Sequence, residues 1–207
     1  KLGINKDNVI FVKDATGAQL ISIFGNQNSH KGKLYNWVKK NKSRVHIFYS
    51  GHGFPGQGDN KAFLVPIDAD LDTINLTGYP LKTLYKNLSK LSAKSITIYL
   101  EACFSGNTPV GNLFPKSSRM ILFKKDEIVP TNLKVYSAGS INQIASWEKD
   151  DSNGLFSKYF LKAVNGEADL DKNGIVNDNE IKSYLEDTMT YFARRYYGRE
   201  QHVKISN

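Results

Sequence analysis

Apolar residues along the chain form short continuous runs that alternate with helix-spaced stripes. Runs typical of buried strands lie at residues 8–12, 45–49, 62–66, 95–100 and 135–138. Helical spacing is found at residues 18–25, 32–40, 81–91, 156–164 and 181–197. Because parallel strands need a crossover that usually contains a helix, this alternation predicts an α/β fold with a mostly parallel sheet.

Two of the predicted strands run into glycine-flanked residues with reactive side chains. The run at 45–49 continues into SGHG, which contains His52, and the run at 95–100 continues into EACFSG, which contains Cys103. Open α/β sheets bind ligands beyond the carboxyl ends of their strands. His52 and Cys103 are therefore expected to share one site if their strands are neighbours.

A cysteine and a histidine in this arrangement are suited to acyl transfer. The imidazole of His52 would take the thiol proton of Cys103 and later protonate the leaving amine, while the backbone N–H groups of Gly53 and Cys103 would hold the carbonyl oxyanion. Taken separately, a lone cysteine is more often a small buried hydrophobe, and a loop histidine more often binds backbone. Their joint placement after two apolar strands favours the catalytic interpretation.

These motifs resemble those of the caspase and metacaspase clan of cysteine peptidases. YSGHG and LEACFSG are about 50 residues apart, as in caspases, and KAFLVPIDAD, SAGSINQIASWE and GLFSKYFLKAV are similar to the bacterial caspase-like branch. The resemblance implies one peptidase domain over residues 1–207, with a three-layer α/β caspase-like fold. It makes His52 the general base and acid, Cys103 the nucleophile, Gly53 an oxyanion donor and Ser140 a substrate-binding residue.

Glu101, two residues before the cysteine, departs from the QACxG motif of animal caspases. In metacaspase-like members an acidic residue here lies in the pocket for the side chain that precedes the scissile bond. We therefore expect cleavage after Arg or Lys, because a buried carboxylate attracts a cation and repels Asp. The alternative is that Glu101 pairs with a neighbouring Lys.

The resemblance carries two further expectations about processing. The family usually has one more strand and helix before the region that corresponds to Lys1, which indicates a truncated chain or a separate N-terminal fragment of the same precursor as a partner. The long loop after Cys103 is basic, and a pocket that prefers Arg or Lys makes it a candidate for self-cleavage. Its basic residues are Lys116, Arg119, Lys124 and Lys125.

Residues 169–180 fit the pattern of an EF-hand calcium loop. The oxygen ligands at loop positions 1, 3, 5 and 12 would be Asp169, Asp171, Asn173 and Glu180, with glycine at the sharp bend. The same stretch also fits a capping box between Asn177 and Glu180, which would start the last helix without metal. Calcium is thus a candidate ligand, and the peptidase chemistry itself requires no cofactor.

The composition bears on the other classes of protein to which the chain could belong. The net charge of +8 is scattered along the 207 residues, so a solvated surface is the simpler interpretation and a basic RNA-binding module a minor alternative. No apolar run reaches the length of a membrane span. We expect a peptide or protein substrate, with neither nucleic acid nor membrane as partner. An inactive caspase-like scaffold that binds partners is the other alternative.

Overall fold

The computed structural model describes residues 4–55, 61–102, 104, 107–108, 111–112, 127–139, 143–150 and 152–207. Within these ranges the chain is an α/β protein with a mixed, mostly parallel sheet of four strands and a small antiparallel sheet of three. The predicted α/β class is therefore confirmed.

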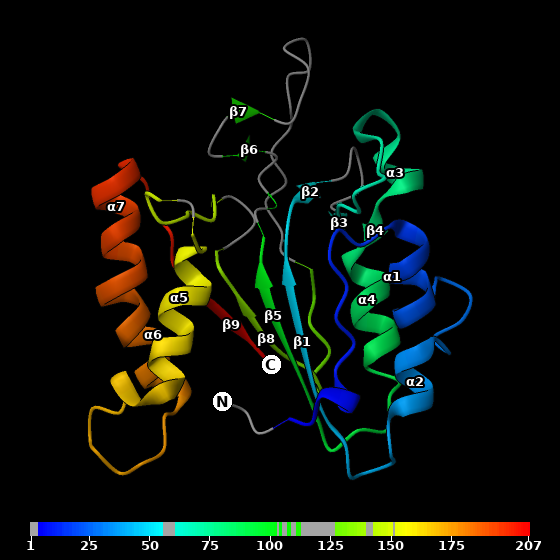
Figure 1. The fold of residues 1–207 in the computed structure, drawn as a ribbon, viewed down its shortest axis with the longest axis horizontal. Coiled ribbons are helices and arrows are strands. Elements are labelled where there is room, and N and C mark those ends of the chain that lie inside the picture. The colour runs from blue at the N-terminus through cyan, green and yellow to red at the C-terminus, as the bar shows by residue number, and fades with distance from the viewer. Residues whose placement is uncertain are drawn as a thin grey trace.

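The four-stranded sheet has the order β1-β5-β8-β9 (Figure 1). Strands β1 (Arg44–Ser50), β5 (Ser95–Glu101) and β8 (Lys134–Ser137) are parallel, and β9 (Lys204–Ser206) pairs antiparallel with β8. β5 therefore has a parallel neighbour on each side, which fits its run of large apolar side chains.

Helices cover both faces of this sheet (Figure 1). One group comprises α1 (Gly17–Phe24), α2 (Lys33–Trp37) and α4 (Leu81–Leu88). The other comprises α5 (Leu155–Lys162), α6 (Asp178–Leu185) and α7 (Tyr191–Tyr197). π-helical turns at Ala163–Glu167 and Glu186–Thr190 follow α5 and α6, so the predicted C-terminal helix at 181–197 forms with one irregular turn. The result is three layers.

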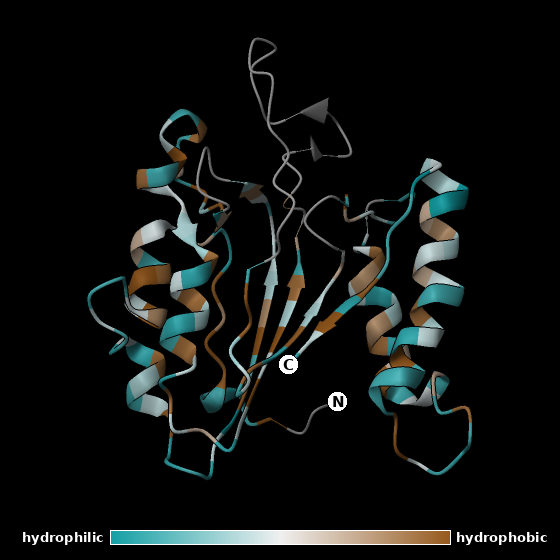
Figure 2. Ribbon diagram, turned by 180° about the vertical axis from the view of Figure 1, so that it is seen from behind, coloured by the Kyte–Doolittle hydropathy of each residue, from teal (hydrophilic) through white to brown (hydrophobic). Residues whose placement is uncertain are grey.

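Alternate side chains of β5 belong to two separate hydrophobic cores. Ile96, Ile98 and Leu100 pack with α4, whereas Tyr99 packs with the core of α5 and α6. Figure 2 shows apolar residues along the central strands. Because successive side chains of a strand point to opposite faces, Glu101, like Tyr99, lies on the α5 face of the sheet.

A small antiparallel sheet follows the exit of β1. It contains β2 (Gly53–Pro55), β3 (Ala62–Leu64) and β4 (Tyr79–Pro80), followed along the chain by α4. Helix α3 (Ile74–Thr77) lies between β3 and β4 in the chain, and Phe54, Phe63 and Ile74 form a core of their own. A two-stranded sheet, β6 (Asn107–Thr108) with β7 (Gly111–Asn112), comes after β5.

Within the described residues the structure corrects one predicted strand and adds five. Residues 8–12 do not join a ladder: a 3₁₀ turn spans Lys6–Asn8, and the apolar residues after it include Phe11, which is 83% exposed. An apolar run becomes a strand only where a neighbouring strand accepts its hydrogen bonds. The strands that the pattern missed have two or three residues each; they are β2, β4, β6, β7 and β9.

Candidate active site

The prediction that the two motif-bearing strands are neighbours in the sheet is confirmed. β1 and β5 pair in parallel over seven positions, from Arg44 opposite Ser95 to Ser50 opposite Glu101. The Gly51 N–H donates to the Glu101 carbonyl at 3.2 Å, one step beyond the last pair. His52, which is exposed, follows its strand by two residues. Cys103 follows β5 by the same two residues but lies outside the described residues.

The backbone N–H of Gly53, the predicted oxyanion donor, is not used in the β2–β3 ladder. Gly53 is buried and lies opposite Leu64 in the β2–β3 pair, and the Val65 N–H donates to the His52 carbonyl at 3.0 Å. In an antiparallel ladder hydrogen-bonded pairs alternate with pairs whose N–H groups point outward. The His52–Val65 pair is of the bonded kind, so the Gly53 N–H points away from β3.

Glu101 lies at the amino end of α5, with only 3% of its surface exposed. Its Oε2 accepts a hydrogen bond from the Ser157 N–H at 2.7 Å. The helix begins after Gly154, which has no side chain to cap it, and a Cβ at Gly154 would lie 2.3 Å from the Glu101 Cδ. Glu101, at the end of β5, thus caps the helix α5, and the absence of a side chain at Gly154 makes room for its carboxylate.

The electrostatics of Glu101 are those of a partly satisfied buried acid. Burial raises the pKa of its carboxyl, while hydrogen bonds from Ser157 and Phe156 oppose that shift. Oε1 is buried without a hydrogen-bond partner in the described part of the chain, as are the hydroxyls of Ser146 and Ser157. Ser146 is close in structure, because its carbonyl accepts the Leu155 N–H at 2.8 Å. Polar atoms without partners therefore gather around this helix end.

The segment after β8 is held by a buried glutamine. Gln201 is fully buried; its Oε1 accepts the Ser146 N–H at 2.8 Å, and its Nε2 donates to the Ala138 carbonyl at 3.0 Å. The Gln143 Oε1 accepts the His202 N–H at 3.1 Å. Ser140, the predicted substrate-binding residue, lies between these anchors but outside the described residues. So do the basic residues of the predicted self-cleavage loop.

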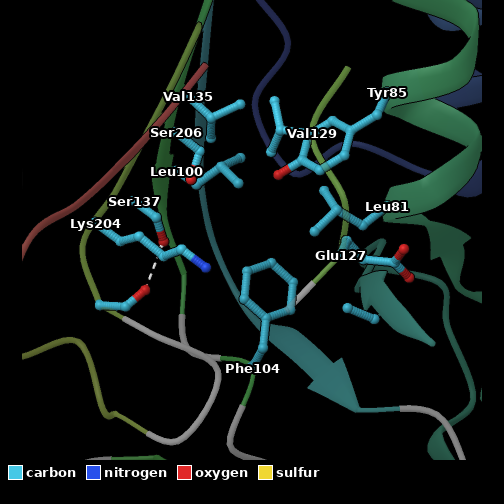
Figure 3. Close-up of a pocket in the computed structure, with 12 residues that line it drawn as sticks. Leu81, Tyr85, Leu100, Phe104, Glu127, Val129, Val135, Ser137, Lys204 and Ser206 are labelled. Atoms are coloured by element: carbon cyan, nitrogen blue, oxygen red, sulfur yellow. Dashed lines mark hydrogen bonds between the residues drawn. The ribbon is translucent and has the colours of Figure 1, made fainter. Parts of the chain in front are cut away.

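A pocket opens on the other face of the sheet, next to the end of β5 (Figure 3). Its apolar walls include Leu81, Tyr85 and Leu100, and Phe104 lies between Lys204 on one side and Glu127 on the other. Burial raises the pKa of Glu127. The sequence pattern gave no signal for Glu127, because its contacts come from distant segments.

The acidic loop has the turn geometry that its pattern predicts. Carboxylate oxygens of Asp169, Asp171 and Glu180 lie within 4.8 Å of one another. The Asn173 N–H donates to both aspartates at 3.1 Å, and Gly174 has a φ of +82° at the bend. This φ favours glycine.

The capping box predicted for the same loop is formed at the start of α6. The Asn177 Oδ1 accepts the Glu180 N–H at 3.1 Å, and the Glu180 Oε2 accepts the Asn177 N–H at 2.9 Å. Glu180 Oε1 also accepts the Leu170 N–H at 3.1 Å. Calcium binding stays a prediction.

A scan against protein-family models finds no match for the chain, and a search of the curated proteins finds no relative. The resemblance to the caspase clan therefore stays a prediction from the sequence motifs. Among the residues described, no helix is both long and apolar enough to cross a bilayer.

Proposed function

We propose that the chain is a caspase-like cysteine endopeptidase with His52 and Cys103 as its catalytic dyad. The observation that carries the proposal is the parallel, in-register pairing of β1 and β5, after which His52 and Cys103 follow at the same step. Adjacent parallel strands are about 4.8 Å apart, a spacing that suits a hydrogen bond between two side chains at their ends.

The proposed reaction forms and hydrolyses a thioester. His52 takes the Cys103 thiol proton, and the thiolate attacks the peptide carbonyl carbon. The N–H groups of Gly53 and Cys103 stabilise the oxyanion until the C–N bond breaks and His52 protonates the leaving amine. Water, deprotonated by His52, then hydrolyses the thioester and restores the thiol. No step needs a metal or cofactor.

Preference for Arg or Lys before the cut remains part of the proposal. Within the described residues Oε1 of Glu101 has no hydrogen-bond partner, which supports this preference, because a buried carboxylate oxygen without a partner gains strongly from a cationic one. In the competing interpretation Glu101 only caps α5. The alternative that Glu101 pairs with a lysine stays open; within the described residues its carboxylate accepts the Ser157 N–H.

The test is hydrolysis of paired fluorogenic peptides that end in Arg or Asp, with and without calcium, and with Cys103→Ala as control. Cleavage of the Arg peptide alone, abolished in Cys103→Ala, supports the dyad and the basic preference. Cleavage of the Asp peptide would overturn the preference. Absence of cleavage under every condition would favour the inactive scaffold, and salt-dependent nucleic-acid binding in its place would favour the RNA-binding alternative.

The same enzyme would process its own basic loop. Intact mass is the readout, with cleavage expected within residues 107–126 in the wild type and none in Cys103→Ala. An unchanged mass under conditions where the Arg peptide is cut would remove this part of the proposal.

The outer edge of β1 is where we expect a separate N-terminal fragment of the precursor to pair. In the described residues β1 pairs only with β5, and Phe48 on the α5 face of β1 is 60% exposed. An exposed apolar edge strand is a template for a further strand. The fragment should co-purify with the chain and protect β1 amides from hydrogen exchange; binding that leaves these amides unprotected would contradict the assignment.

A further inference from the structure

The hydroxyl of Tyr49 contacts the backbone of the histidine that follows it by three residues. It donates to the His52 carbonyl at 2.8 Å and accepts the Val65 N–H at 3.2 Å. The same Val65 N–H also donates to the His52 carbonyl at 3.0 Å. A closed set of hydrogen bonds thus joins the exit of β1, the carbonyl of His52 and the segment after β3.

The sequence around Tyr49 makes this contact possible. Tyr49 is on the α4 face of β1, where it packs with the core of Val45 and Ile47. A Cβ at Gly51 would lie 2.9 Å from the Tyr49 hydroxyl oxygen and 3.1 Å from Cζ, so any side chain there would push the ring aside. Gly51 is thus needed for the approach of the tyrosine ring.

The hydroxyl keeps its proton at neutral pH. Burial raises the pKa of Tyr49 to about 12, although the hydrogen bond with Val65 opposes the shift. Tyr49 therefore remains a donor to the His52 carbonyl over the whole range in which an imidazole titrates.

We propose that Tyr49 is a positioning residue that fixes the backbone of His52 and so the direction of its imidazole. The His52 side chain is exposed, and the direction of its Cα–Cβ bond, which the backbone sets, limits where the imidazole can reach. As far as the reaction rate is concerned, this inference rests on the proposed function. A general base must lie within hydrogen-bonding reach of its proton, and a displacement of about 1 Å lowers a rate about 100-fold.

The test is Tyr49→Phe, which removes one oxygen atom and leaves the ring in place. Tyr79→Phe is the matched control, because the Tyr79 hydroxyl also donates to a backbone carbonyl at 2.8 Å, that of Gly25. Readouts are the NMR titration of the His52 imidazole, hydrogen exchange of the Val65 amide, and kcat and KM for the Arg peptide.

Tyr49→Phe is expected to shift the His52 resonance, to speed exchange at Val65 and to lower kcat about 10- to 100-fold with KM little changed. Tyr79→Phe should change none of these. An unchanged His52 resonance and Val65 exchange rate in Tyr49→Phe would overturn the inference. Movement of the His52 resonance in a chain that cleaves no peptide would support the positioning and count against the proposed peptidase.

Discussion

Gly154→Ala tests whether the carboxylate of Glu101 caps α5 in the way that the structure describes. A Cβ at Gly154 would lie 2.3 Å from the Glu101 Cδ and 2.5 Å from each carboxylate oxygen, which is far inside van der Waals contact. Glu101 is only 3% exposed, so its carboxylate cannot move aside without displacing neighbouring groups. We expect it to leave the helix end and to lose its hydrogen bond to Ser157.

The cost has two parts. Overpacking by one methyl group in a closed site costs about 1–3 kcal/mol, and loss of a hydrogen bond to a charged acceptor costs about 1.5–3 kcal/mol. Together they give a loss of about 4 kcal/mol, a large share of the 5–15 kcal/mol that is typical of a domain. For a chain of this length the unfolding midpoint should fall by roughly 10 °C.

Urea denaturation of Gly154→Ala alone and combined with Glu101→Ala measures the coupling. Without the carboxylate, the alanine should cost less than about 1 kcal/mol, since only its weaker capping propensity remains. Gly17→Ala is the control: Gly17 begins α1, and a Cβ there meets its nearest atoms at an ordinary 3.7 Å. An equal cost of Gly154→Ala in both backgrounds would refute the reasoning.

Three further predictions concern Glu101, Gln201 and the acidic loop. Because burial raises the pKa of Glu101 above 4.5, the folded state binds its proton more tightly than the unfolded chain. The free energy of unfolding should therefore fall as pH rises from about 4.5 through the raised value, and urea denaturation of Glu101→Gln should lack this slope; an identical slope would contradict the assignment. Gln201→Leu should cost about 3 kcal/mol in urea denaturation by leaving the Ser146 N–H and a buried carbonyl unpaired, and a loss below about 1 kcal/mol would show that the segment is held otherwise. Calcium at about 100 times its dissociation constant should stabilise the wild type by about 2.7 kcal/mol, seen as a higher unfolding midpoint; Asp171→Ala, which leaves the α6 capping box intact, should abolish the effect, and no effect in the wild type would refute the calcium site.

The sequence pattern was sufficient to predict strands that are continuous apolar runs. β1, β5 and β8 are apolar runs, so each was predicted, and the glycine-flanked ends of the first two located the candidate site. β9 was missed because Lys204–Ser206 is short and only partly buried. The run at 8–12 was mispredicted because strand formation depends on a partner, which hydrophobicity does not report.

The contacts that shape the site join residues far apart in sequence, so no local pattern predicts them. Glu101 and Ser157 are 56 positions apart, and Gln201 reaches Ser146 across 55. A glycine before an apolar helix gives no sign that an acid from a strand will cap that helix. Only the register of β5 and the place of α5 over its end bring the two together.

Glu101 can cap α5 and also serve the proposed specificity pocket, because the two roles use different carboxylate oxygens. The Ser157 N–H occupies Oε2, and the positive end of the helix dipole favours the ionised form, whereas burial disfavours it. In the proposed enzyme, a substrate guanidinium or ammonium at Oε1 would offset that desolvation cost, because an opposite charge lowers the pKa of a buried carboxyl. A substrate aspartate would add a second buried negative charge beside the first. Selectivity for a basic side chain would therefore follow from the burial of Glu101 itself, and Glu101→Gln should reduce the preference for Arg over neutral residues while keeping a hydrogen-bond acceptor at the helix end.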